Sequence, residues 1–330
     1  MRCQRLSRII RAASAAAGLG VLIAPQPDPA LAESVQKAGI EQSIRSMGAV
    51  IDGPAMAALF APLQEREPYA GVRVSRDAPY GPAALNVLDV FSAEQKTTAP
   101  RPILIFVHGG GFNSGDKRAG AGSPFYDNVA LWAVRHGFAG INMNYRKAPE
   151  ARWPAAAEDV ALAVRWAEKN AESFGGDPNR IYVMGHSAGA THVASYVSDS
   201  RLWGGPRPPV RGAVIISGSF VAESLDRVPA GDRPFVEKAQ LYFGDRLDDG
   251  RSSLDGLTTS KVPLLIVNAE FDPPYFTRQR SLLEEAVRGR EKRSAEFVTL
   301  PGENHMSEVF SVNSPDTSLS DRLLRFIGDQ

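Results

Sequence analysis

The stretch Ile181-Tyr182-Val183-Met184-Gly185-His186-Ser187-Ala188-Gly189 decides the fold of this chain. Its first four residues form an apolar run that predicts a buried strand, and residues 191–196 continue it as a predicted helix. The two glycines flank Ser187 at equal spacing, which lets neighbouring backbone pass where a Cβ would block it. The stretch therefore predicts a strand that turns sharply into a helix, with the serine exposed at the turn.

The same alternation of apolar runs and helical periodicity continues on both sides of this turn. Strands are predicted at 103–107, 138–143, 181–184, 213–217, 264–268 and 296–300, and helices at 125–136, 155–174, 188–199, 276–288 and 318–327. Continuous apolar strands separated by crossover helices indicate a parallel sheet covered on both faces. An antiparallel pair at 72–74 and 85–91 brings the expected sheet to eight strands.

The N-terminus has the pattern of a secretory signal. A basic segment (Arg2, Arg5, Arg8, Arg11) precedes an apolar stretch at 12–24 and the sequence Ala30-Leu31-Ala32. This pattern predicts cleavage after Ala32 and export to the periplasm or the medium. The apolar stretch is too short to cross a bilayer, so no stable membrane partner is expected.

The rest of the chain, residues 33–330, is predicted to be a single domain. Residues 33–68 are expected to form a small helical cap, broken into two pieces at Gly53-Pro54. The segment 218–263 has no strong periodicity and lies between two strands, where additional cap elements can be inserted. Its composition does not resemble that of a linker.

Composition excludes several classes of function. The chain has 37 Lys and Arg against 37 Asp and Glu, so its charge favours neither nucleic acid nor an anionic membrane as partner. The only cysteine, Cys3, lies in the predicted signal, so no disulfide is expected. Since no His-Glu-x-x-His spacing occurs, neither a metal nor another cofactor is expected.

A nucleophilic serine needs a base, a carboxylate that orients the base, and N–H donors for an oxyanion. His305 is the candidate base, because it follows the strand 296–300 in a predicted loop at the strand's carboxyl end. His108 and His186 lie beside backbone features that suit structural hydrogen bonds, and His136 ends a surface helix. His192 lies on the helix after Ser187 and points away from it.

The orienting carboxylate is expected between the serine and the histidine in the chain. Asp272 fits best, because it ends the turn after the strand 264–268 and is followed by Pro273-Pro274. Glu270 is the alternative.

The oxyanion donors are expected from His108-Gly109-Gly110-Gly111-Phe112, which follows the strand 103–107 directly. Gly110 and Gly111, together with Ala188, are predicted to form the oxyanion hole. A phosphate cradle is the competing interpretation, but it requires a Gly-Lys-Ser/Thr ending that the sequence lacks.

Several residues near these motifs are candidates for the substrate pocket, although side chains at strand ends also pack in cores. The predicted pocket residues are Phe112, His186, Trp153 and Tyr275, and the further aromatic candidates are Tyr126, Phe220 and Phe276.

Together these motifs resemble the α/β-hydrolase esterases, specifically the carboxylesterase, feruloyl-esterase-like and kynurenine-formamidase-like branch. The resemblance covers approximately residues 69–327, and beyond the serine turn and the glycine run it rests on Ser114-Gly115-Asp116-Lys117, Asn144-Tyr145-Arg146-Lys147-Ala148-Pro149-Glu150, Trp153-Pro154-Ala155-Ala156, Glu158-Asp159 and Asn304-His305. It implies an α/β-hydrolase fold and a carboxylesterase-type serine hydrolase that acts on small-molecule esters, with Ser187, Asp272 and His305 as its triad.

Two departures narrow the resemblance. His186 stands where hormone-sensitive-lipase-like relatives have an acidic residue, and Gly111 stands where the formamidases commonly have tyrosine. An arylformamidase or amidase is the alternative enzyme. A non-catalytic binding protein on the same fold is the alternative from another class, and a broken triad would indicate it; the predicted triad is unbroken.

Overall fold

The computed structural model describes residues 29–95, 99–120, 122–244, 251–288 and 295–328. The chain divides into two compact units, Met1–Gly39 and Ile40–Gln330, and the division falls within the first helix, α1 (Pro29–Met47). Most of the predicted signal segment lies outside the described residues. No helix among the described residues is long and apolar enough to cross a membrane.

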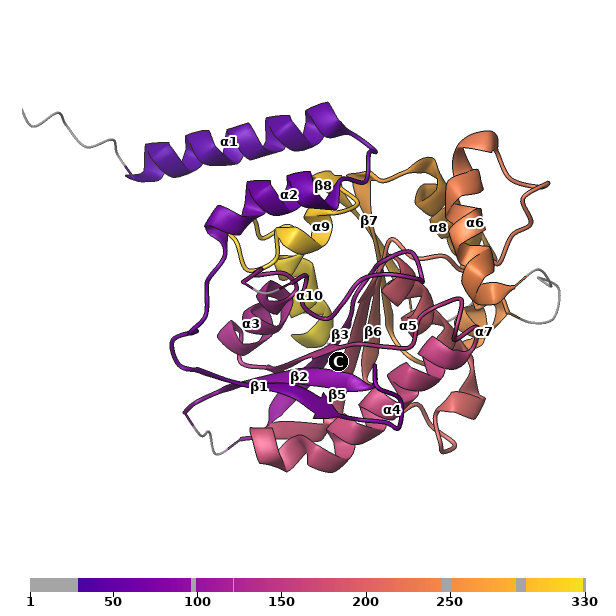
Figure 1. Ribbon diagram of the computed structural model, residues 1–330, viewed down its shortest axis with the longest axis horizontal. Helices are drawn as coiled ribbons and strands as arrows, with labels where there is room; N and C mark the ends of the chain where they lie inside the picture. The colour runs from indigo at the N-terminus through magenta and orange to yellow at the C-terminus, as the bar shows by residue number, and fades with distance from the viewer. Residues whose placement is uncertain (1–28, 96–98, 121, 245–250, 289–294, 329–330) are drawn as a thin grey trace, which may run out of the picture. The chain divides into compact units, whose positions relative to one another are not determined.

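The second unit is built on one eight-stranded sheet with the order β1-β2-β4-β3-β5-β6-β7-β8 (Figure 1). β1 and β2 pair antiparallel, β2 pairs antiparallel with β4, and all other neighbours are parallel. The strands are β1 (Val72–Pro79), β2 (Val87–Ala93), β3 (Arg101–Val107), β4 (Ala139–Met143), β5 (Gly176–His186), β6 (Gly212–Ile216), β7 (Leu264–Phe271) and β8 (Ala295–Asn304). The predicted mostly parallel sheet with an antiparallel start is confirmed.

The five helices predicted after residue 100 are present to within a few residues. The α-helices after α1 are α2 (Gly53–Phe60), α3 (Asp127–Arg135), α4 (Ala155–Asn170), α5 (Ala188–Ser198), α6 (Arg233–Phe243), α7 (Leu254–Thr259), α8 (Pro274–Val287), α9 (Ser307–Phe310) and α10 (Ser320–Gly328). Of these, α6, α7 and α9 were not predicted. Short 3₁₀ helices are η1 (Ala61–Leu63), η2 (Ala171–Phe174), η3 (Ser200–Leu202) and η4 (Ala230–Asp232). Two predicted loops are in fact strand, because β7 continues to Phe271 and β8 to Asn304.

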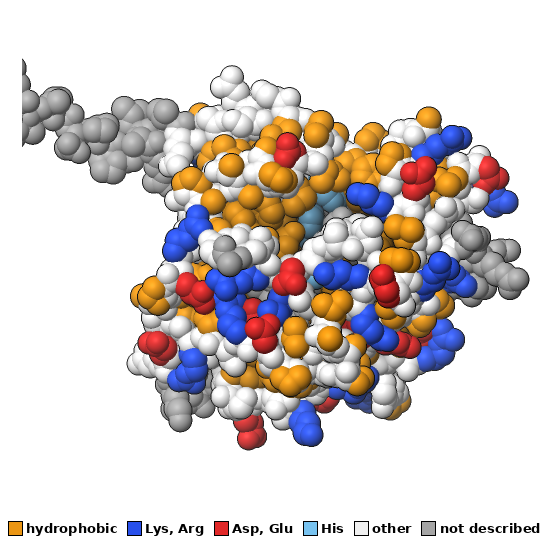
Figure 2. All heavy atoms as spheres, in the orientation of Figure 1, with side chains coloured by type: hydrophobic (Ala, Val, Ile, Leu, Met, Phe, Trp, Pro, Cys, Tyr) orange, Lys and Arg blue, Asp and Glu red, His pale blue; other side chains and the backbone are white. Residues whose placement is uncertain are grey.

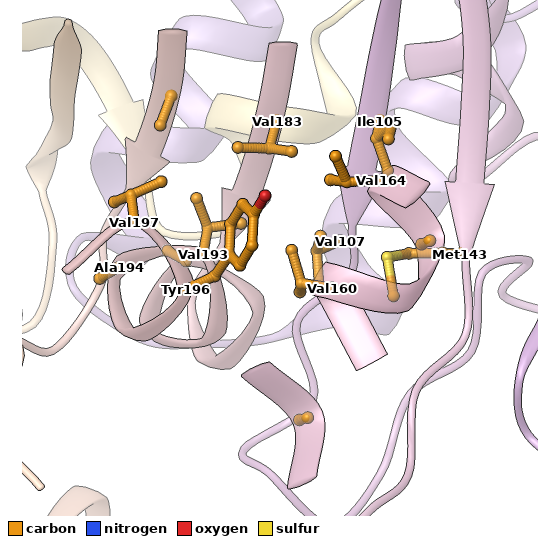
Figure 3. Packing of buried hydrophobic residues seen from close by; sticks show 14 of the residues in the cluster. Ile105, Val107, Met143, Val160, Val164, Val183, Val193, Ala194, Tyr196 and Val197 are labelled. Atoms are coloured by element: carbon orange, nitrogen blue, oxygen red, sulfur yellow. The ribbon is translucent and has the colours of Figure 1, made fainter. Parts of the chain in front are cut away.

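Alternate residues of each central strand enter two different cores. In β5, Val183 belongs to the core shared with α4 and α5, whereas Met184 belongs to the core shared with α3 and α10. Figure 3 shows the first core, where Val160 and Val164 of α4 lie beside the strand residues. Both faces of the sheet are therefore covered, which explains why its strands read as continuous apolar runs.

The N-terminal segment is broken into two helices as predicted, but the break lies between Met47 and Gly53, just before the pair Gly53-Pro54. These residues open α2 instead of interrupting a helix, because proline suits the first helical turn and the Asp52 side chain accepts a hydrogen bond from the Ala55 N–H at 2.9 Å. The chain after α2 is bound to the C-terminal region, since Gln64 donates to the carbonyl oxygen of Phe310 at 2.9 Å.

The segment 218–263 contains helices that the sequence did not reveal. Phe235 of α6 stacks on Tyr275 of α8, with ring centroids 5.3 Å apart and an interplanar angle of 7°. Arg278 of α8 forms two ion pairs: one with Asp232, which directly precedes α6, at 2.7 Å, and one with Glu223 at 2.5 Å. These contacts hold α6 beside the start of α8.

Candidate active site

The serine turn has the strained geometry that its sequence predicts. Ser187 lies between β5 and α5 with φ 56° and ψ −120°, a backbone conformation that residues other than glycine rarely adopt. A Cβ on Gly185 would lie 2.4 Å from the Gly189 carbonyl oxygen, and a Cβ on Gly189 would lie 2.1 Å from that of Val107. Only glycine fits at these two positions, so the flanking backbone forces the serine outward.

His305 follows β8 directly and contacts the serine. Its Nε2 lies 3.0 Å from Ser187 Oγ, and its Nδ1 lies 2.9 Å from Asp272 Oδ1. Phe276 stacks on the imidazole with ring centroids 4.4 Å apart. The histidine and the aspartate are both buried, so the hydrogen bonds that join them are shielded from water.

The Asp272 side chain is itself held by three donors. Its Oδ2 accepts hydrogen bonds from Ser217 Oγ at 2.5 Å, Asn268 Nδ2 at 2.8 Å and the Ala269 N–H at 3.3 Å. The alternative acid, Glu270, is exposed and accepts instead from the Gly302 N–H at 2.7 Å. Of the two carboxylates considered from the sequence, the structure thus brings Asp272 to the histidine.

The glycine run lies beside the serine. Gly110 and Gly111 have φ values of 136° and 60°, and both line the same cavity as Ser187 and Ala188. Among the described residues, the N–H groups of Gly110, Gly111 and Ala188 have no hydrogen-bond acceptor. Three free donors around a serine hydroxyl are what an oxyanion requires.

The motif residues after the glycine run hold its loop in place. The Lys117 ammonium binds buried Asp89 at 2.9 Å, and the Lys117 N–H donates to Asn144 Oδ1 at 2.6 Å. Asn144 in turn donates to Asp116 Oδ2 at 2.9 Å. Ser114 and Gly115 line the cavity, whereas Asp116, Lys117 and Asn144 do not and contribute to the site by fixing the loop.

Three other histidines are buried and have structural surroundings. His186 Nε2 lies 2.7 Å from the carbonyl oxygen of His305, so His186 positions the base as well as lining the cavity. His108 Nδ1 lies 2.6 Å from the Gly109 carbonyl oxygen. His192 packs among the rings of Phe112 and Tyr145. Burial lowers the pKa of all three, to about 4 for His108 and about 3 for His192.

Glu308 is the buried carboxyl group that sequence reasoning missed. Its Oε1 lies 3.3 Å from His186 Nε2 and 3.9 Å from His305 Nδ1. Burial, with the nearby Asp272 carboxylate, raises the pKa of Glu308 well above its usual range. His305 lies in the turn before α9, three residues ahead of Glu308, and this local geometry brings the two side chains together. Sequence alone does not distinguish this arrangement from an exposed acidic residue.

His186, His305 and Glu308 together have the residue types of a metal site, with one ligand atom of each within 4.8 Å of the others. However, both His305 nitrogens are already hydrogen-bonded, to Asp272 and to Ser187, and His186 Nε2 is bonded to a backbone oxygen. The arrangement therefore fits hydrogen bonding within the triad better than it fits a cation.

The cavity at the serine has a volume of about 250 Å³. Figure 2 shows it as a hollow in which pale-blue histidine is visible, bordered by hydrophobic side chains and a blue cationic one. Among the predicted pocket residues, Phe112, His186 and Tyr275 line it, as do Tyr126 and Phe276. Its other lining side chains include Ile51, Phe235, Lys238 and Met306.

The prediction for Trp153 is wrong. Its side chain faces a separate hollow beside Arg251, with the guanidinium carbon 5.9 Å from the ring centroid, and it packs against the core beneath α4 and α5. Trp153 lies two residues before α4, and its packing against the core decides the direction of its side chain. Phe220 likewise is part of that core.

The buried histidines predict acid sensitivity. Because the pKa of His192 is about 3 in the folded chain and near 6.5 when unfolded, the unfolded chain binds more protons between these values. The stability that neutral His192 contributes is therefore complete above pH 6.5 and is lost as pH falls toward 3. In His192→Leu, the slope of the unfolding free energy against pH should therefore be smaller by up to about 1.4 kcal/mol per pH unit. Urea unfolding at pH 7, 6, 5 and 4 measures this slope. The exposed control His136→Leu should keep the wild-type slope; equal slopes in all three proteins would contradict the assignment.

Comparison with known proteins agrees with this geometry. The BD-FAE family model matches residues 88–201, which include the glycine run and the serine turn. Esterase LipC of Mycobacterium tuberculosis is 29% identical over 241 residues, or 68% of this chain and 58% of LipC. Ethyl acetate hydrolase of Pseudomonas putida is 30% identical over 183 residues, or 52% of this chain and 55% of that enzyme. The chain thus matches a little over half the length of these curated relatives.

Solved structures share the whole architecture. The crystal structure of esterase B from Lactobacillus rhamnosis superposes with a TM-score of 0.68 at 17% identity, covering 91% of this chain and 96% of that one. The thermophilic carboxylesterase EstE1, cloned from a metagenomic library, gives a TM-score of 0.62 at 21% identity, covering 88% and 96%. The chain therefore has the α/β-hydrolase fold.

Proposed function

We propose that this protein is a serine hydrolase that cleaves carboxylic esters of small to medium acyl or aryl groups through an acyl-enzyme. The observation that carries the proposal is the hydrogen-bonded chain Ser187–His305–Asp272, which opens into a cavity that is also lined by Gly110, Gly111 and Ala188, whose N–H groups have no acceptor in the described part of the chain. The esterase names of the relatives support the same reaction class. Fold alone would not, because this fold hosts many activities.

Each step uses a group already in position. His305 Nε2 takes the Ser187 proton as Oγ attacks the ester carbonyl carbon, and Asp272 holds the imidazole through Nδ1. The N–H groups of Gly110, Gly111 and Ala188 receive the oxyanion. His305 then protonates the departing alcohol, and water, activated by the same imidazole, releases the acid from Ser187 and regenerates the hydroxyl.

A panel of substrates tests this function against the arylformamidase alternative. We expect acetyl to hexanoyl p-nitrophenyl esters to be hydrolysed with higher kcat/KM than N-formylkynurenine, because the cavity of about 250 Å³ accommodates acyl groups larger than formyl. A feruloyl ester tests larger aryl groups, and EDTA should leave the rates unchanged because no step requires a metal. A preference for N-formylkynurenine over every ester would transfer the assignment to the formamidases, and loss of activity with EDTA would contradict a metal-free mechanism.

We also propose that the protein is exported after cleavage behind Ala32. The arginines, the apolar stretch and the Ala-x-Ala ending of residues 1–32 support this proposal. N-terminal sequencing of the protein recovered from the periplasm or the medium should begin at Glu33. Recovery of full-length protein from the cytoplasm alone would contradict it.

A further inference from the structure

Lys238 is the only charged side chain, histidines apart, among the described residues that line the cavity. It lies on α6 three residues after Phe235, so both side chains occupy one face of the helix and meet the cavity together. Its Cδ lies 3.0 Å, and its Nζ 3.6 Å, from the point that a Cβ on Gly111 would occupy. The aliphatic part of the lysine thus covers the glycine loop and carries its ammonium to the mouth of the cavity.

The Lys238 ammonium has no ion-pair partner among the described residues. Two carboxylates that lie beside α6 in the fold, Asp232 and Glu223, are engaged with Arg278. No carboxylate lines the cavity in the described part of the chain. Lys238 is exposed, so solvent screens its charge, but an ammonium at a cavity without a competing carboxylate still attracts an anionic ligand.

We propose that Lys238 binds a carboxylate carried by the substrate, so that the preferred substrates are esters with one anionic end. This inference rests on the proposed ester hydrolysis and adds the substrate class to it. The apolar rings Phe235, Phe276 and Phe112 accommodate the hydrocarbon part, while the ammonium selects the charged end. The carboxylate can belong to the acyl chain or to the alcohol, and the two cases have different test substrates.

A second role for Lys238 has a different kinetic consequence. The lysine lies over the glycine loop that holds two of the proposed oxyanion donors, so its charge can also act on the oxyanion. Stabilisation of an oxyanion would accelerate every ester alike and act mainly on kcat. Recognition of a substrate carboxylate would act only on anionic esters and mainly on KM.

The test compares substrates of equal length with and without the charge. Mono-p-nitrophenyl adipate and p-nitrophenyl hexanoate differ by one carboxylate on the acyl chain, and 4-hexanoyloxybenzoate and phenyl hexanoate differ by one on the alcohol. In Lys238→Met, the ratio of kcat/KM for the charged ester to that for its neutral partner should fall about 2- to 5-fold, chiefly through KM. Lys238→Glu should lower the ratio further. In the wild type, the ratio should decrease as NaCl is raised from 0.02 to 0.5 M.

Lys261→Met is the matched control, because Lys261 is exposed but lines a different hollow. Its ratio should equal that of the wild type. The proposal is overturned if Lys238→Met lowers kcat/KM equally for the charged and the neutral ester of a pair, because the lysine would then act on the oxyanion. It is also overturned if neither ratio of kcat/KM changes. Failure of the wild type to hydrolyse any of the four esters would instead overturn the proposed function itself.

Discussion

Ser187→Ala should reduce kcat for p-nitrophenyl butyrate by about 10⁴-fold or more while the chain stays folded. The substitution removes the attacking oxygen but keeps the Cβ, so the strained turn and its packing are preserved. The residual rate should be the part supplied by the oxyanion donors and by substrate binding. Steady-state kinetics measure the loss, and a fluorophosphonate probe should label the wild type but not the variant.

Ser187→Gly provides a second variant that tests the geometry rather than the chemistry. Glycine adopts φ near 56° without the cost that a side chain incurs, so this variant should be as inactive as Ser187→Ala but have a higher Tm. Circular dichroism confirms that both variants are folded. Near-normal hydrolysis by either variant would show that another nucleophile performs the reaction.

Asp272→Asn should lower kcat by about 10³- to 10⁴-fold. The amide cannot stabilise the imidazolium, and its NH₂ group favours the wrong tautomer of His305. Ser217, Asn268 and Ala269 hold the present carboxylate, so the side chain's position should survive the substitution. Glu270→Gln should change kcat less than about threefold, because Glu270 is exposed and bound to Gly302.

Glu308 provides the decisive comparison for this prediction. Its carboxyl oxygen lies 3.9 Å from the same His305 nitrogen that Asp272 contacts at 2.9 Å, too far for a hydrogen bond. Glu308→Gln should therefore retain at least a tenth of the wild-type kcat. If Asp272→Asn is nearly as active as the wild type and Glu308→Gln is not, the orienting acid is Glu308.

The local sequence pattern was sufficient to predict most strands of the sheet and the turn at Ser187. Strand positions follow from apolar runs, because a strand buried on both faces has no polar side. The turn at Ser187 follows from its glycines, since no other residue tolerates contacts of 2.1 to 2.4 Å at a Cβ. Predicted strand ends were less accurate. β8 continues to Asn304, because Asn304 pairs with Phe271 of β7 beyond an irregularity that contains Pro301 and Gly302.

Interactions between distant segments account for what local pattern missed. Trp153 is an aromatic residue beside a motif, and only the packing of the core beneath α4 and α5 turns it away from the cavity. Lys238 lies in a segment with little periodicity, and it reaches Gly111 because the rings and ion pairs of α8 hold α6 in place.

The sequence by itself determined the class of fold and the serine at the sharp turn, because both depend on short-range sterics and on periodic burial. Only the tertiary structure decided which carboxylate faces His305, that Glu308 is buried beside it, and which side chains line the cavity. These features depend on contacts between residues far apart in the chain, such as Ser217 with Asp272 and His186 with His305. A side chain's direction is set by the surface packed against it, and that surface exists only once the strands have been brought together.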